Sequence, residues 1–205
     1  MKLKNAFIKV KNKIEVIINR SKLKNKEFTI ISNNCWGGMV YQKFGLKYNT
    51  PTIGLFFIGE DYIKFCSRLE YYTSIELEFI NFNDSKNYDL IKEQSEYPIA
   101  KLDDIEVYFM HYRSIEEARE KWNRRCERIN FKNILFKISQ REGYTKEFIL
   151  QFSNLPWKNK IVFSYDYIDN AIIVPELKEL KGDEMSIIDN LVDYVELLNG
   201  LEVQS

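Results

Sequence analysis

Short apolar segments alternate with segments of helical spacing along the chain from Phe28 onward. The apolar segments, rich in Ile, Val and Phe, are FTIIS (28–32), TIGLFFI (52–58), IELEFI (75–80), IEVYFMHY (105–112), NILFKIS (133–139), KIVFSY (160–165) and AIIV (171–174). Helices are expected at 36–44, 61–72, 114–129, 145–155 and 186–199, and a long polar loop at 81–98. This alternation predicts an α/β fold with a mainly parallel, Rossmann-like sheet and flanking helices. The 205 residues have room for one such domain, expected at residues 27–205.

A basic segment, residues 1–26, precedes this domain. It holds eight Lys and Arg20 against one acid, Glu15; this gives +8 and, since the chain is neutral overall, leaves −8 on the remainder. Its apolar residues recur every three or four positions, which predicts an amphipathic helix: Leu3, Phe7, Val10, Ile14 and Ile17. Such a stripe usually packs on a core, so docking on the domain is favoured. Contact with an anionic membrane surface is the alternative.

The cysteines and the apolar content indicate a cytoplasmic chain. Cys35, Cys66 and Cys126 are odd in number, far apart and without a CxxC pair, so disulfides are not expected. Residues 1–26 lack the uninterrupted apolar core of a secretory signal. The longest uncharged stretch, 28–42, contains Ser, Asn and Gly and is no membrane span. We therefore expect a cytoplasmic protein, peripheral to the inner membrane face if the basic segment binds lipid.

The stretch SNNCWGG (32–38) joins the first expected strand to the first expected helix. Its Ser and Asn residues are good helix N-caps, and Gly37 and Gly38 permit a tight turn or close approach to a ligand. If the helix begins here, its N–H groups can bind an anion and favour the thiolate of Cys35. The alternative is a tight turn around a buried, inert cysteine. The stretch matches neither a P-loop nor the GxGxxG dinucleotide fingerprint.

His111 is the only histidine of the chain and lies at the end of the expected strand 105–112. In a parallel sheet, this strand end would face the same crevice as SNNCWGG. Cys35 and His111 are therefore expected to come together as a nucleophile–base pair. A structural, hydrogen-bonded histidine is the alternative.

Other signals for chemistry are weak. Arginines spread over the expected helix 114–129 are suited to phosphates, although ordinary i,i+4 pairs such as Glu120–Arg124 explain most of them. The sequence has no HExxH, DxD or Cys/His cluster, so no metal site is expected. Nucleic-acid binding is not expected, because basic charge is confined to one tail and no nucleic-acid-binding motif stands out. No cofactor can be named.

Three stretches resemble a bacterial family of unknown function that is often labelled exopolysaccharide biosynthesis protein. They are ISNNCWGGMVYQKFGLKYNTPTIGLFF (31–57), VYFMHYRSIEEAREKWNRRCERINFKN (107–133) and LPWKNKIVFS (155–164). The resemblance implies one shared cleft, with Cys35 and His111 as its catalytic residues. The substrate-binding residues that it implies are Ser32, Asn33, Asn34, Gly37, Gly38, Asn49, Tyr112, Trp122, Arg125 and Arg128.

The resemblance implies a role in exopolysaccharide or capsule synthesis, and three functions remain open. The first is a transferase, with acyl transfer to a polysaccharide precursor as its reaction, Cys35 as nucleophile or substrate contact and His111 as base. The second is a glycosyltransferase-like enzyme that uses a nucleotide sugar without DxD. The third is a non-enzymatic partner of a polysaccharide assembly complex. For an enzyme, the expected partner is a small-molecule or lipid-linked saccharide substrate.

Overall fold

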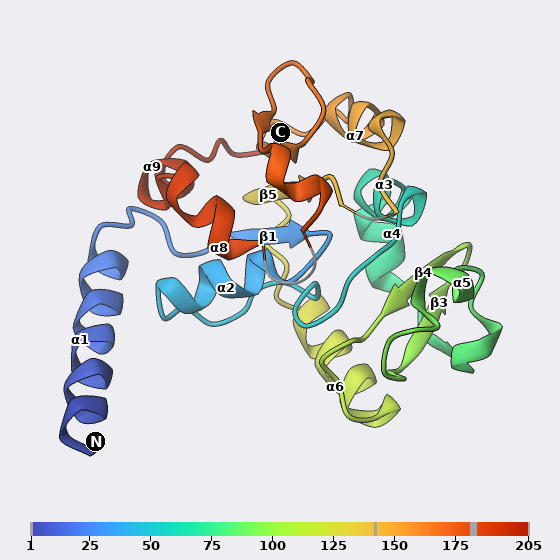
Figure 1. Cartoon of the computed structure of the whole chain (residues 1–205), viewed down its shortest axis with the longest axis horizontal. Coiled ribbons are helices and arrows are strands. Elements are labelled where there is room, and N and C mark those ends of the chain that lie inside the picture. The colour runs from blue at the N-terminus through green and yellow to red at the C-terminus, as the bar shows by residue number, and fades with distance from the viewer. Residues whose placement is uncertain (1, 142, 181–183, 205) are drawn as a thin grey trace.

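A parallel β-sheet forms the centre of the molecule, which we describe from a computed structural model (Figure 1). The structure describes residues 2–141, 143–180 and 184–204. Within them, the sheet has the strand order β1-β5-β6-β7, and each neighbouring pair is parallel. The strands are β1 (Thr29–Ser32), β5 (Ile134–Ser139), β6 (Lys160–Ser164) and β7 (Ile172–Ile173). The predicted α/β fold with a mainly parallel sheet is confirmed.

Helices cover both faces of this sheet. One layer consists of α2 (Trp36–Lys43), α8 (Met185–Ile188) and α9 (Tyr194–Asn199). The other consists of α3 (Glu60–Ser67), α4 (Leu69–Ser74), α6 (Ile115–Cys126) and α7 (Lys146–Ser153). Side chains alternate along each strand, so Ile30 packs into the first layer and Ile31 into the second. β1, β5 and β6 are therefore buried on both faces, which explains their continuous apolar runs, whereas Ile173 of β7 is exposed.

A second, smaller sheet is antiparallel and lies beside the second helical layer (Figure 1). It consists of β2 (Glu78–Ile80), β3 (Ile99–Leu102) and β4 (Ile105–Tyr108). The segment 105–112 was expected to extend the parallel sheet, and this prediction is wrong. The segment 52–58 was expected to be a strand but forms one isolated bridge, between Phe56 and Tyr108. The expected loop at 81–98 contains a short helix, α5 (Tyr88–Ile91).

Local sequence signals set several helix ends. Ser114 caps α6 by accepting a hydrogen bond from the Glu117 N–H, and the Glu117 carboxylate accepts one from the Arg113 N–H at 2.9 Å. Gly45 follows α2 with φ of 59°, a left-handed conformation that favours glycine. The helix expected at 186–199 is instead divided into α8, a 3₁₀ turn (Asp189–Leu191) and α9.

The N-terminal helix α1 (Lys2–Ser21) projects away from the body of the molecule (Figure 1). Ile14 and Ile17 of its apolar stripe are 52% and 60% exposed. The interpretation that the stripe docks on the domain is therefore wrong for this described part of it. No membrane-spanning helix is found among the described residues.

Candidate functional site

SNNCWGG lies at the carboxyl end of β1, as the sequence predicts. Ser32 is the last residue of the strand, and Cys35 directly precedes α2. The side chains of this turn bond to its own backbone. The Trp36 N–H donates to Asn34 Oδ1 at 3.1 Å, and the Gly37 N–H donates to Ser32 Oγ at 3.2 Å. The start of α2 is thus held by side-chain oxygens from the preceding loop.

The two glycines of the motif serve packing between α2 and its neighbours. A Cβ at Gly37 would lie 3.0 Å from Ser32 Oγ and 3.1 Å from Ile30 Cγ2, and one at Gly38 would lie 3.3 Å from Ile53 Cδ1. Glycine therefore lets the helix lie directly on β1. The expectation that the Gly37 N–H is available to an anion is wrong, because it already donates to Ser32.

Lys137 of β5 is the centre of a buried polar cluster beside this turn. Its Nζ forms an ion pair with the Glu184 carboxylate and donates to Asn34 Oδ1 at 3.0 Å. The Trp36 and Phe163 rings lie 5.7 and 5.8 Å from the same nitrogen. Burial lowers the pKa of Lys137 to about 8, although Glu184 opposes this shift.

Besides Trp36 Nε1, three polar atoms of this region are buried without a hydrogen-bond partner among the described residues: Asn34 Nδ2, Ser139 Oγ and Glu184 Oε2. Asn34 and Glu184 both bond Lys137, and Ser139 points to the same sheet face two residues further along β5. We call these four residues the edge cluster: Asn34, Lys137, Ser139 and Glu184. Buried polar groups are nearly always paired, so these atoms mark a place where a polar group belongs.

Asn33 has a structural role next to the edge cluster. Its Nδ2 donates to the Ser139 carbonyl at 3.0 Å, and its Oδ1 accepts from the Ser139 N–H at 3.1 Å. This two-way bond continues the pairing of β1 with β5 beyond the end of β1. Asn33 thereby fixes the position of the turn that carries Cys35.

A second charged group reaches the site from α6. The Tyr112 hydroxyl donates to the Ile53 carbonyl at 2.6 Å, and Arg125 Nη1 donates both to that hydroxyl and to the Ile53 carbonyl. The Tyr48 ring lies 5.4 Å from the Arg125 guanidinium carbon. Arg125 is buried. Within the described residues, all hydrogen bonds of its side chain are donated by Nη1. The remaining guanidinium N–H groups can serve a ligand.

Cys35 lies between these two groups. Its ionised sulfur would raise the pKa of both Lys137 and Tyr112, so it lies within electrostatic range of both side chains. Cys35 is half-buried, whereas Cys66 is fully buried. The structure therefore brings together Cys35, the edge cluster and the Tyr112–Arg125 pair at one edge of the parallel sheet.

The structure removes the basis for pairing Cys35 with His111. The prediction required the strands before the two residues to end at one edge of one parallel sheet, but β4 belongs to the antiparallel sheet. His111 is exposed, and its backbone N–H donates to the Gly54 carbonyl at 3.0 Å. It adjoins Tyr112, which does belong to the site. A Cys35–His111 pair remains a prediction without its topological basis.

The other predicted binding residues lie in different surroundings. Trp122, which is predicted to bind substrate, is buried in the core against Phe65 and Phe109. Asn49 is half-buried, and its carbonyl accepts a hydrogen bond from Thr29 Oγ1 at 2.8 Å. Arg128 is half-buried near the end of α6. No group of three or more potential metal-binding side chains occurs among the described residues.

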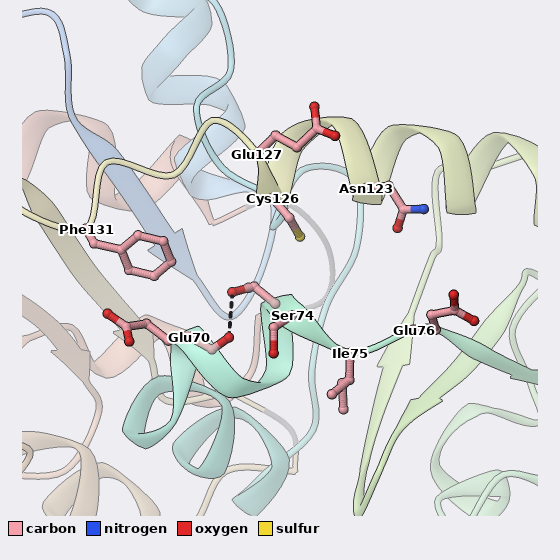
Figure 2. A pocket seen from close by; sticks show the side chains of 9 residues that line it. Glu70, Ser74, Ile75, Glu76, Asn123, Cys126, Glu127 and Phe131 are labelled. Atoms are coloured by element: carbon pink, nitrogen blue, oxygen red, sulfur yellow. Dashed lines mark hydrogen bonds between the residues drawn. The ribbon is translucent and has the colours of Figure 1, made fainter.

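A surface depression lies elsewhere, in an open groove between α4 and α6 (Figure 2). Figure 2 shows the Cys126 sulfur pointing toward Ser74, with the carboxylates of Glu70, Glu76 and Glu127 around the groove. Burial raises the pKa of the Cys126 thiol to about 12. A thiol of this kind is unreactive at neutral pH, so the groove does not compete with the edge of the parallel sheet as a reaction site.

Comparison with known proteins places the chain in a family. A family model described as a domain of unknown function (DUF1919) matches residues 5–201. The chain belongs to the DUF1919 family. An uncharacterized protein of Haemophilus influenzae is 32% identical over 168 residues, which cover 78% of this chain and 76% of that protein. DUF1919 membership carries no activity with it, so function must be argued from the site.

Sequence reasoning missed Lys137, Ser139 and Glu184. Lys137 had a recognisable signal, since it is a lone charge within the apolar strand segment NILFKIS (133–139). A charge in a strand buried on both faces requires a partner. The partner, Glu184, lies 47 residues further along the chain, in a polar segment with no distinctive pattern.

Proposed function

We propose that this DUF1919 protein is a transferase of exopolysaccharide or capsule synthesis that acts on a saccharide precursor. Its site is the edge of the parallel sheet at Cys35. The single observation that carries the proposal is the position of Cys35: half-buried, directly before a helix, and within electrostatic range of Lys137 and of the Tyr112 side chain that Arg125 bonds. Neighbouring cations and a helix N-terminus favour the thiolate, which is the nucleophilic form of cysteine. The sequence resemblance supplies the polysaccharide context.

Acyl transfer is the reaction that suits this thiol best. The Cys35 thiolate attacks the carbonyl carbon of an acyl thioester donor, and the donor thiolate leaves with the proton that Cys35 lost. A saccharide hydroxyl then attacks the acyl-Cys35 thioester, forms an ester, and gives its proton to the departing sulfur. In this scheme His111, which adjoins Tyr112, carries the proton. Arg125 binds phosphates of the donor.

A glycosyltransferase-like enzyme that lacks DxD is the second candidate. The observation that favours it is the Arg125 guanidinium, whose remaining N–H groups suit the diphosphate of a nucleotide sugar as well as that of an acyl donor. In either case the acceptor is a small-molecule or lipid-linked saccharide. The two candidates differ in donor and in whether an acyl group becomes attached to Cys35.

The first test is a melting-temperature comparison with short-chain acyl-CoAs and with nucleotide sugars. We expect acyl-CoA to raise the melting temperature, because a ligand that binds only the folded chain stabilises it. Intact mass spectrometry should then find an acyl adduct on wild type and on Cys126→Ala, but not on Cys35→Ala. Cys126 is the matched control, since it is also half-buried but has a raised pKa.

The results separate the two candidates. Stabilisation by nucleotide sugars alone, without an acyl adduct, would favour the glycosyltransferase-like enzyme. An adduct that survives in Cys35→Ala would remove Cys35 from the mechanism. If neither ligand class stabilises the chain, both enzyme candidates are contradicted. The role as a partner of an assembly complex then remains.

A further inference from the structure

The apolar stripe of α1 points away from the rest of the molecule. Ile14, Ile17 and Ile18 are 52%, 60% and 50% exposed. On a helix of about 3.6 residues per turn, they lie within roughly a third of the circumference. The sequence continues the same spacing at Leu3 and Phe7. Three exposed isoleucines side by side on one helix are unusual, because apolar residues normally occur singly on an exposed surface.

α1 contacts the body with its opposite side. The Val16 side chain faces Gly45, where an added Cβ would lie 2.6 Å from Val16 Cγ1. Arg20 Nη1 reaches the Gly45 carbonyl at 3.5 Å. Val16 lies about half a turn from the centre of the stripe, and Arg20 lies next to Val16 around the helix. Attachment to the body through this side therefore holds the stripe outward.

Basic side chains flank the stripe. Lys11 lies just beyond Ile18 around the helix, Lys13 lies just beyond Ile17, and both lysines are exposed. An apolar face flanked by lysines is typical of a helix that lies in a lipid interface. The apolar face enters the boundary of the acyl chains, and the lysines lie at the level of the anionic headgroups. Two such helices packed stripe to stripe would bring lysines against lysines, which disfavours a symmetric pair of α1 helices.

We propose that α1 binds this protein peripherally to an anionic lipid surface, through insertion of the Ile14–Ile17–Ile18 stripe and attraction of the flanking lysines. The inference does not depend on the transferase reaction, because it rests on α1 alone. It gives the molecule a lipid-facing side distinct from the edge of the parallel sheet. A protein held in this way meets a membrane-bound saccharide without a membrane-spanning segment.

The test is flotation of the full chain with phosphatidylcholine vesicles that contain or lack phosphatidylglycerol. We expect binding only to the phosphatidylglycerol vesicles, weakening as salt rises. The triple variant Ile14→Ser/Ile17→Ser/Ile18→Ser should bind at least about tenfold more weakly. Lys11→Glu/Lys13→Glu should also lose about tenfold. Leu150→Ser is the matched control, since Leu150 is 41% exposed on α7, and it should bind like wild type.

Three results would overturn the proposal. One is equal binding to both kinds of vesicle. Another is undiminished binding by the triple serine variant, whose unfolding midpoint serves as the check that it folds. The third is a lower molar mass of the triple serine variant than of wild type, measured by light scattering, together with unchanged vesicle binding. That third result would assign the stripe to a second copy of the chain.

Discussion

Two polar clusters that each hold a buried carboxylate differ in the number of their polar atoms that are paired, and also in the burial of the lysine, since Lys86 is 45% exposed and Lys137 is fully buried. The first is the edge cluster around Lys137. The second, which we call the small-sheet cluster, consists of Asp61, Ser85, Lys86, Glu106 and Tyr108. It joins α3 to the antiparallel sheet. Each cluster contains a buried carboxylate that bonds a lysine.

The small-sheet cluster satisfies all of its carboxylate oxygens. Glu106 Oε2 accepts from the Ser85 and Tyr108 hydroxyls at 2.7 and 2.6 Å, and its Oε1 accepts from the Lys86 N–H. Asp61 accepts from Lys86 Nζ at 2.6 Å and from the Glu106 N–H at 2.9 Å. A fully paired network of this kind rigidifies and specifies a fold. Its residues require no ligand to explain them.

Among the described residues, the edge cluster leaves one atom unpaired on each of three residues, Asn34, Ser139 and Glu184. It lies where ligands bind in α/β sheets, at the carboxyl ends of the strands. The small-sheet cluster belongs to α3, the antiparallel sheet and the segment before α5. Unpaired buried polar atoms, rather than buried charge itself, therefore distinguish the candidate site from the structural cluster.

The largest effect is expected from removal of the Lys137 charge. Lys137→Met leaves the Glu184 carboxylate buried without its cation, and we expect a loss of about 3–5 kcal/mol in the free energy of unfolding. Both side chains are almost completely buried, so solvent does not screen the pair. The measurement is urea denaturation at pH 7.

The double variant Lys137→Met/Glu184→Leu is the control for that experiment. It removes both charges and should recover most of the lost stability, because the desolvation cost of the pair disappears with it. A double variant as unstable as Lys137→Met would mean that packing around the Lys137 side chain, rather than charge pairing, supports this edge.

A matched pair of serines tests the comparison directly. Ser85 and Ser139 are both buried, but Ser85 Oγ bonds the Glu106 carboxylate while Ser139 Oγ has no partner in the part of the chain that the structure describes. Ser85→Ala should lower the free energy of unfolding by about 1–3 kcal/mol, and Ser139→Ala by less than about 0.5 kcal/mol. Thermal and urea unfolding of the two variants in parallel provide the measurement.

The same serines separate stability from ligand binding. Ser139→Ala should weaken stabilisation by the ligand found in the donor screen, whereas Ser85→Ala should not. Equal stability losses in the two variants would contradict the distinction between the clusters, because Ser139 would then be shown to make a hydrogen bond of its own.

Much of the fold could be predicted from periodicity and caps. The strands at 29–32, 134–139 and 160–164 and the helix that Ser114 caps all follow local signals. Sheet membership could not be predicted in the same way. The segment at 105–108 has the composition of a buried strand, and nothing local indicates that it pairs with 99–102 in a separate sheet. That choice depends on long-range packing.

The site was predictable only in part, for the same reason. SNNCWGG could be placed at the end of β1, because strand and helix patterns meet there. The glycines were interpreted as ligand-facing, but the close approach of α2 to β1 that requires them depends on tertiary packing. His111 was attached to the site by an argument about sheet order that the structure overturns. The ion pair of Lys137 with Glu184 joins segments that no local pattern connects.

A further prediction concerns pH and again centres on Lys137. Burial lowers its pKa from the ordinary value of 10.5 to about 8 in the folded chain. Between these values the unfolded chain binds more protons than the folded one, so the free energy of unfolding should rise with pH from about 8 upward. The slope from one group is at most about 1.4 kcal/mol per pH unit. Urea denaturation of wild type and of Lys137→Met/Glu184→Leu between pH 7 and about 10 isolates this contribution, because the tyrosines whose pKa is raised by burial are common to both proteins. A wild type that loses stability relative to the double variant over this range would show that Glu184 outweighs burial and raises the pKa of Lys137.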